Sequence, residues 1–299
     1  MSSRDLSVRG VIPNLIIPFA QDGHVLMDVV SREITYLDES GVDAISIGAF
    51  NSETAGSTAD ELFRICETAR RHTRKPLLAT ILPDSEPEAA ELLDAVIKGG
   101  ADAVLVAQPH YLFQPDGASL TKMFERLRAR TNSPILLANV LTLAPVDLAT
   151  MTRMVEGSIV DGILQGGDAH LLVDLLRSRP GVPIFSAIED LHLVSLLLGG
   201  AGLISGLAAV FPKECVALYR DFAKKNYEGA REKHERLLRL WHVLDHPVEQ
   251  LSRVRVALAA QGRDVGSPRS PYSVIAEESS LEVRRALTRE GVRAPLEAL

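Results

Sequence analysis

The stretch SIVDGILQGGD, residues 158–168, indicates how this 299-residue chain folds. It joins a short, mainly apolar run, residues 159–164, directly to polar residues and a pair of glycines. An apolar run of this length without polar alternation is typical of a parallel strand that is buried on both faces. The polar residues then stand at the carboxyl end of the strand, where α/β barrels carry their functional groups.

Seven further runs of this kind recur along the chain. The eight runs are residues 11–19, 42–48, 77–82, 101–108, 134–140, 159–164, 182–187 and 201–206. Amphipathic helical segments separate them, and one of these opens with Thr58 and Glu61 at the spacing of a capping box. Eight alternating units predict an α/β fold, a (β/α)8 TIM barrel. The competing doubly wound sheet needs a glycine-rich turn after its first strand, and IIPFAQDG is not one.

Beyond the eighth strand the chain continues with helical apolar spacing and almost no strand character. We therefore expect the barrel to span residues 1–225. Residues 226–299 should form a C-terminal helical extension that packs on the barrel, so that the whole is a single structural domain.

Composition and charge restrict the partners of the chain. Hydrophobic residues make up 46% and charged residues 24%, which suits a large core, and the net charge of −7 argues against nucleic-acid binding. No apolar stretch is long enough to span a membrane, and the N-terminus has no signal core. Cys66 and Cys215 stand far apart in helical patterns, which favours a reducing, cytoplasmic setting over a disulfide framework.

Five stretches resemble, in sequence and in order, the dihydrodipicolinate synthase and N-acetylneuraminate lyase family. They are GVIPNLIIPF (10–19), SGVDAISIGAFNSETAGST (40–58), GGADAVLVAQPHYLFQP (99–115), ANV (138–140) and LLLGGAGLISGLAAVFPKE (196–214). The resemblance implies a (β/α)8 barrel with a C-terminal helical extension, assembled as a dimer or tetramer. It also implies an enzyme that makes or breaks carbon–carbon bonds through a Schiff base between a lysine and pyruvate or a related 2-oxo acid.

The chain departs from the family pattern at the lysine itself. The family carries G-I-K-E or G-I-K-D on the sixth strand, whereas GILQ places Leu164 at the lysine position and Gln165 after it. Only a primary amine can form the iminium, and of the seven lysines only Lys213 follows a strand on the correct side of the barrel. The turn after the second strand is also altered, and the arginine expected after the fifth strand is missing.

The polar residues that follow the strands are the candidate site. We expect catalytic roles for Tyr111, which stands where the family has a proton-relay tyrosine, and for Glu53 and His110. The expected substrate-binding residues are Asn51, Ser52, Asn139, Gln165, Ser186, Glu189 and Ser205. Structural roles compete with these functions. Glu53 could brace its own loop, and Glu189 with Asp190 could cap a helix that starts at Leu191. Tyr111 could instead pack at a subunit interface, and His110 could be exposed or lie at such an interface.

Glu53, His110, Asp168 and Glu189 could in principle converge on a metal ion, but these residues have no recognised ligand spacing. We expect neither a metal ion nor another cofactor.

Two functions remain open. The first is a divergent lyase-type enzyme, aldolase-like but without the Schiff base, acting on a small carbonyl or acid substrate at the carboxyl face of the barrel. The alternative is a noncatalytic paralogue that binds a ligand or has a regulatory or structural role. Leu164, with apolar neighbours such as Ala49 and Leu141, should make the pocket suit a neutral or bulky ligand better than a small dianion.

Overall fold

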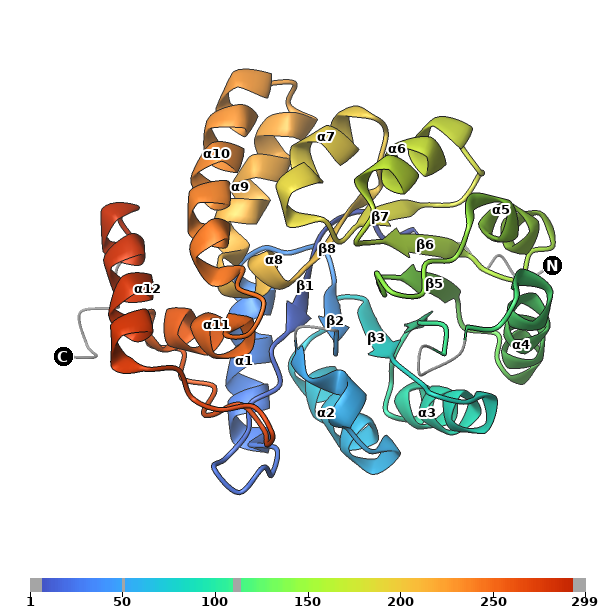
Figure 1. Ribbon diagram of the computed structural model, residues 1–299, viewed down its shortest axis with the longest axis horizontal. Coiled ribbons are helices and arrows are strands. Elements are labelled where there is room, and N and C mark those ends of the chain that lie inside the picture. The colour runs from blue at the N-terminus through green and yellow to red at the C-terminus, as the bar shows by residue number, and fades with distance from the viewer. Residues whose placement is uncertain (1–6, 50–51, 110–113, 293–299) are drawn as a thin grey trace.

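The computed structural model describes residues 7–49, 52–109 and 114–292, and it confirms the predicted TIM barrel (Figure 1). Eight parallel strands close in chain order, with β1 paired to β8. The strands are β1 Gly10–Leu15, β2 Ile45–Ile47, β3 Leu77–Ile81, β4 Ala103–Val106, β5 Ile135–Asn139, β6 Gly162–Gln165, β7 Ile184–Ser186 and β8 Gly202–Ser205. Each strand lies inside a predicted apolar run or extends one residue beyond it.

Helices connect the strands and surround the barrel. They are α1 Met27–Glu39, α2 Ala59–His72, α3 Glu86–Lys98, α4 Gly117–Arg130, α5 Leu148–Glu156, α6 Ala169–Ser178, α7 His192–Leu197, α8 Gly206–Val210 and α9 Pro212–Ala223. Short 3-10 turns occur at η2 Thr54–Gly56 and η3 Glu189–Leu191. The capping box expected from Thr58 and Glu61 is present at the start of α2, where the two residues satisfy each other's backbone donors.

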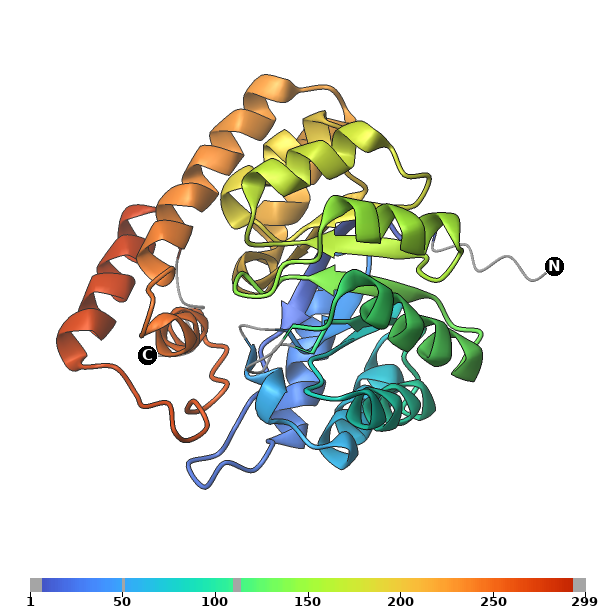
Figure 2. The same cartoon turned by 45° about the vertical axis from the view of Figure 1, so that its right-hand side comes forward.

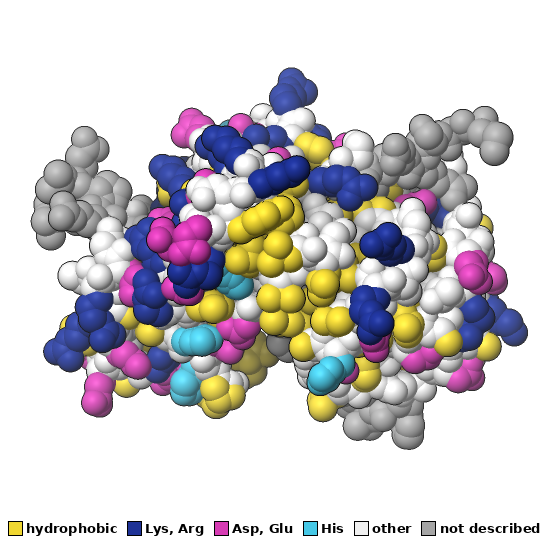
Figure 3. All heavy atoms as spheres, turned by 90° about the horizontal axis from the view of Figure 1, so that it is seen from above, with side chains coloured by type: hydrophobic (Ala, Val, Ile, Leu, Met, Phe, Trp, Pro, Cys, Tyr) yellow, Lys and Arg dark blue, Asp and Glu magenta, His cyan; other side chains and the backbone are white. Residues whose placement is uncertain are grey.

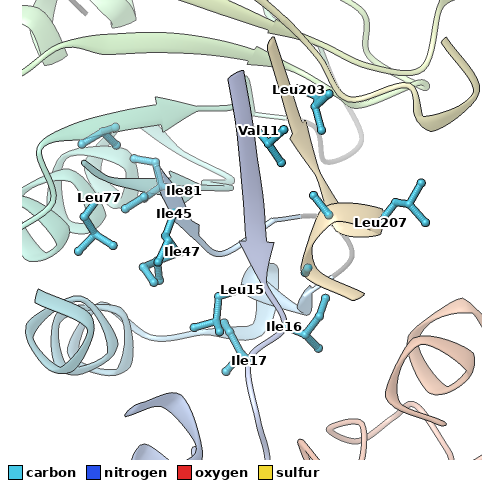
Figure 4. Close-up of a cluster of buried hydrophobic side chains, with 14 of the residues drawn as sticks. Val11, Leu15, Ile16, Ile17, Ile45, Ile47, Leu77, Ile81, Leu203 and Leu207 are labelled. Carbon is cyan, nitrogen blue, oxygen red and sulfur yellow. The ribbon is translucent and has the colours of Figure 1, made fainter. Parts of the chain in front are cut away.

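The alternation of side chains along the strands divides the apolar core in two. One cluster fills the inside of the barrel and contains Ile12, Leu136, Leu164 and Phe185. The other lies between the strands and the surrounding helices, and Figure 4 shows part of it, including Val11 and Leu203. Because successive side chains of a strand point to opposite faces, Leu164 faces the barrel interior and its neighbour Gln165 faces the helices.

Three helices follow the barrel: α10 Tyr227–Leu244, α11 Gln250–Ala259 and α12 Glu277–Arg289. They gather on one side of the barrel in both views of the chain (Figures 1 and 2). Helix α10 packs along α9 and also contacts α7. Among the described residues, no helix is both long and apolar enough to cross a membrane.

Two buried ion pairs fasten this C-terminal extension to the barrel. Arg263 Nη2 lies 2.6 Å from Glu33 Oε2 of α1, and the guanidinium group also donates from Nη1 and Nη2 to two carbonyl oxygens of α8. Arg255 Nη2 lies 2.7 Å from Glu53 Oε1, in the loop after β2. Burying a charge is costly unless a partner is in place, so each pair holds the extension in one position relative to the barrel.

We expect Arg263→Leu to lower the free energy of unfolding by about 3–5 kcal/mol, because Glu33 would remain buried without its partner. Replacing both residues by Leu should recover much of this loss. Arg32→Ala, which removes only an exposed pair with Asp28 on the same helix, is the matched control and should change little. Urea titration followed by circular dichroism measures all three. Equal losses for Arg263→Leu and the double variant would contradict this account.

Candidate active site at the barrel mouth

A cavity of about 310 Å³ opens at the carboxyl ends of the strands. Its lining residues are Asn14, Ala49, Thr80, Val140, Thr142, Leu164, Gly166, Gly167, Ala187, Glu189, Ile204, Gly206, Trp241, Asp245 and Gln250. Most of them come from strand ends and from the loops that follow. The last three come from the C-terminal extension, so the extension forms part of the rim. A larger hollow on the chain is lined by α12 alone and has no strand ends beside it.

Leu164 contributes the side chain of β6 to this cavity. It is paired across the sheet with Ala138 of β5 and Phe185 of β7, and only 4% of it is exposed. The position at which the family resemblance expects a reactive lysine therefore holds a hydrocarbon side chain inside the barrel. None of the described residues that line the cavity is a lysine.

The structure places Lys213 outside the mouth. It lies in the first turn of α9, and its Nζ atom is 5.3 Å from the centroid of the Tyr36 ring of α1. This is a cation–π contact on the outer side of the barrel. The geometry gives no support to Lys213 as a relocated nucleophile.

Gln165 and Asn139 form a buried pair behind the cavity wall. Asn139 Nδ2 donates to Gln165 Oε1 at 2.8 Å, and Asn139 also exchanges two hydrogen bonds with the backbone of Val146. Gln165 Nε2 donates to the carbonyl of Gly166. Neither residue lines the cavity. The two amides brace the loop between β5 and α5, which is a different place from the substrate contact expected of them.

Glu189 is the more buried of the two described acidic residues that line the cavity. It is buried, with 7% of it exposed. Its Oε2 accepts a hydrogen bond from Ser205 Oγ at 2.6 Å, and its Oε1 accepts from the backbone N–H groups of Gly206 and Leu207 at 3.0 and 3.1 Å. Burial raises the pKa of Glu189 to about 7, although these hydrogen bonds oppose the shift.

These contacts correct one expectation. Glu189 does not cap the helix that follows it. It caps α8, because β7 and β8 are neighbours in the sheet and the loop after β7 lies beside the start of α8. Asp190 does not serve as a cap either and instead lies 3.0 Å from His242 Nε2 of α10, at the surface.

His192 lies directly behind Glu189. Its Nε2 atom is 3.0 Å from Glu189 Oε2, without the alignment of a hydrogen bond, and 2% of the residue is exposed. Burial, together with the nearby His234, lowers the pKa of His192 to about 3. His192 is therefore neutral near pH 6, where Glu189 holds its proton.

The three serines of the candidate site have structural contacts. Ser205 Oγ accepts a hydrogen bond from Ala208 N and so caps α8, and Ser186 Oγ accepts one from Ile188 N. Ser52 Oγ donates to the carbonyl of Ala49. None of the three lines the cavity. They shape the loops around it.

Glu53 is held by the C-terminal extension. Its Oε1 pairs with Arg255, and its Oε2 accepts a hydrogen bond from Arg269 N at 2.8 Å. It has a left-handed backbone, with φ of 60°, and it does not line the cavity. The bracing role is the alternative that the sequence offers for Glu53, but the contacts are with the C-terminal extension and not with its own loop.

The remaining expected residues do not join a cluster. Asp168 caps α6 by accepting a hydrogen bond from Leu171 N. Tyr111, His110 and Asn51 lie outside the described residues, so their roles stay predictions. Within the described ranges, no three His, Cys, Asp or Glu side chains gather in a way that could hold a metal ion.

Sequence reasoning missed several residues of the mouth. Asn14 is a polar residue inside the apolar run of the first strand, and this interruption is a signal that could have identified it. Trp241, Asp245 and Gln250 had no such signal. They belong to helices far along the chain, and their place at the rim depends on how the extension docks.

The fold and this mouth define a class: a (β/α)8 barrel whose candidate site lies at the carboxyl ends of the strands. Residues 7–290 match the model of the dihydrodipicolinate synthetase family, and the chain belongs to that family.

The similarity to known proteins extends along nearly the whole chain. A 4-hydroxy-tetrahydrodipicolinate synthase of Archaeoglobus fulgidus is 28% identical over 93% of this chain and 96% of its own length. An uncharacterized DapA-like lyase of Thermococcus onnurineus is 27% identical over 94% of this chain and 98% of its own length. A solved structure described as the first monomeric dihydrodipicolinate synthase variant has the same fold. Its TM-score is 0.87 at 24% identity, over 95% of this chain and 97% of that one.

The raised pKa of Glu189 predicts a specific effect of pH on stability. The folded protein holds this proton more tightly than the unfolded chain, whose glutamate has the ordinary value of 4.5. The stability that Glu189 contributes is therefore complete below about pH 4.5 and is lost as the pH rises through 7. His192 acts in the opposite sense, because its lowered pKa removes stability as the pH falls below 6.5.

Glu189→Gln removes the effect of the glutamate titration and keeps the effect of the His192 titration. Relative to the native protein, this variant should gain stability as the pH rises from about 4.5 to just above 7, by on the order of 3 kcal/mol. Denaturant unfolding across this pH range measures the difference. A constant difference would mean that Glu189 titrates near its ordinary pKa in the folded protein.

Proposed function

We propose that this chain is a divergent lyase-type enzyme of the dihydrodipicolinate synthetase family that acts on a small carbonyl compound without a lysine Schiff base. The observation that carries the proposal is Leu164, whose side chain lines the cavity from β6, where the resemblance in sequence leads us to expect the family's lysine. An iminium needs a primary amine at the carbonyl carbon. Without an amine, the described side chains can activate the carbonyl by hydrogen bonding and proton transfer.

Glu189 is the group best suited to move that proton. A general acid or base works best when its pKa lies near the working pH, and burial brings the pKa of Glu189 to about 7. As a carboxylate it would take a proton from the carbon next to the carbonyl, and as an acid it would return one. Ser205 and the first N–H groups of α8 position its oxygens. A proton relay through Tyr111 or His110 remains part of the proposal.

The alternative function is a noncatalytic paralogue that only binds a ligand. Its support is that three hydrogen bonds already engage Glu189 in holding α8, as a purely structural carboxylate would be. The two functions differ in whether a bound carbonyl compound exchanges its protons with the solvent.

Proton exchange separates an enzyme from a binder. Hydroxyacetone incubated with the protein in deuterium oxide should lose the proton signals next to its carbonyl faster than the free compound does. Glu189→Gln should slow this catalysed exchange by about a hundredfold, the usual size of a general-base effect. Asp190→Asn, an exposed neighbour that faces α10, is the matched control. If the native protein binds the compound but does not speed exchange, the noncatalytic function is correct.

Borohydride trapping with pyruvate tests the absence of the Schiff base. The native protein should gain no mass, whereas Leu164→Lys should form a reducible imine, because a buried lysine has a lowered pKa and attacks carbonyls as a neutral amine. Leu164→Met, similar in length but without an amine, is the control. A pyruvate adduct on any lysine of the native protein, Lys213 included, would contradict the proposal. No adduct on Leu164→Lys would contradict the assignment of this position.

We further propose that the chain is cytoplasmic and forms a homo-oligomer, a dimer or tetramer. A relative described as the first monomeric variant implies that other synthases associate. Three aliphatic side chains at α7, Val194, Leu197 and Leu198, are 41%, 55% and 41% exposed. Hydrophobic side chains gather in the view of Figure 3, which looks down on the side where α6, α7 and α10 lie in Figure 1. A second copy of the chain would cover such a surface.

Sedimentation tests this assembly. We expect the native chain to sediment as a dimer or tetramer, and the double variant Leu197→Glu, Leu198→Glu to sediment as a smaller species, because two charges would have to be buried at the contact. Leu281→Glu on α12, where the leucine is 42% exposed, is the control and should not change the assembly. A native chain that sediments as a monomer would contradict the oligomer.

A further inference from the structure

We propose that the mouth cavity selects an uncharged or cationic carbonyl compound that carries an alcohol or amine group, and discriminates against the anions of 2-oxo acids. This inference rests on the proposed function for the location of the site, but it concerns the charge of the ligand and does not depend on turnover.

The charges around the cavity favour this selection. Among the described lining residues two are acidic, Glu189 and Asp245, and none is Lys, Arg or His. The two internal segments that the structure does not describe, residues 50–51 and 110–113, contain no Lys or Arg in the sequence and one histidine, His110. A carboxylate that enters this cavity would lose its hydration without meeting a Lys, Arg or His among the described lining residues.

The buried arginines that stand nearest in sequence to Gln250 of the rim are already engaged. Arg253 of α11 donates to the carbonyl of Val243 and pairs with Glu249, and Arg255 pairs with Glu53. Neither lines the cavity. An incoming carboxylate would have to break a buried pair to recruit one of them, which costs several kcal/mol.

Asn14 supplies a second, independent reason. It lies on β1, lines the cavity and is only 6% exposed, yet its Oδ1 atom has no hydrogen-bond partner in the described part of the chain. An unpaired buried acceptor is costly, and a ligand that donates a hydrogen bond to it removes that cost. Hydroxyl and ammonium groups donate, whereas a carboxylate only accepts.

The rest of the cavity fits a small ligand with an apolar portion. Leu164 and Ile204 form an aliphatic part of the lining, and Trp241 adds an indole ring. The volume of about 310 Å³ is at the lower end of the range for small-molecule sites. Asp245, which accepts a hydrogen bond from Gln250 Nε2 at 3.0 Å, places a negative charge at the rim. A cationic ligand would meet this charge on entry.

Three probes of nearly equal size test the charge selection. Pyruvate, hydroxyacetone and aminoacetone all carry a methyl ketone, and they differ in having a carboxylate, a hydroxymethyl or an aminomethyl group. We expect hydroxyacetone and aminoacetone to bind at least about tenfold more tightly than pyruvate, a difference of one charged contact. Chemical-shift titration of the labelled protein at constant ionic strength, up to tens of millimolar probe, measures these weak affinities.

Variants connect the selection to the named residues. Asn14→Leu should weaken hydroxyacetone binding by about fivefold or more and leave the unfolding temperature equal or higher, because it removes an unpaired buried polar group. Asp245→Asn should weaken aminoacetone binding and leave hydroxyacetone unchanged, and Asp190→Asn, which faces α10, should affect neither probe.

The proposal is overturned if pyruvate binds as tightly as hydroxyacetone, if none of the three probes binds, or if Asn14→Leu leaves the affinity for hydroxyacetone unchanged. The borohydride test of the proposed function is independent of these outcomes. A protein that binds hydroxyacetone selectively but forms a pyruvate adduct with borohydride would sustain the ligand class and refute the proposed function.

Discussion

The structure depends on the two-residue alternation of side chains in a closed barrel. Each strand is hydrogen-bonded on both sides, so no strand can slip by one residue without turning every side chain to the wrong face. On β6 this constraint directs Leu164 to the cavity and Gln165 to the helices. The chemistry open to the barrel mouth follows from which of these two neighbours faces inward.

Glu189 and Glu53 show how burial and partners assign different roles to similar side chains. Both are 7% exposed. Glu53 faces a guanidinium group and a backbone donor, so its charge is balanced and the residue acts as a tie between β2 and the extension. Glu189 faces neutral donors and an unprotonated histidine. No cation offsets the cost of burying its negative charge, so its pKa is raised to about 7. Only Glu189 combines this property with access to the cavity.

The fold could be predicted from the sequence because its signals are local. Apolar runs, caps such as Thr58 and glycine turns each report on a few neighbouring residues, and eight repeats of one pattern leave few alternatives. The inward position of Leu164 also followed from the motif GILQ. The roles of Asn139, Gln165 and Ser205 could not be foreseen, because their partners are set by contacts across strands. The rim formed by Trp241 and Asp245 depends on a docking between segments more than two hundred residues apart, Glu53 and Arg255 among them.

The docked extension also separates the residues that decide whether the barrel folds from some of the residues that decide which ligands it admits. The interior layers, which decide whether the chain folds, are made from the strands, whereas Trp241, Asp245 and Gln250 reach the mouth from helices fastened outside by Arg255 and Arg263. Substitutions on those helices can therefore alter which molecules enter without disturbing the strands. The barrel can therefore come to bind new ligands, during evolution or in the laboratory, through substitutions in its C-terminal extension.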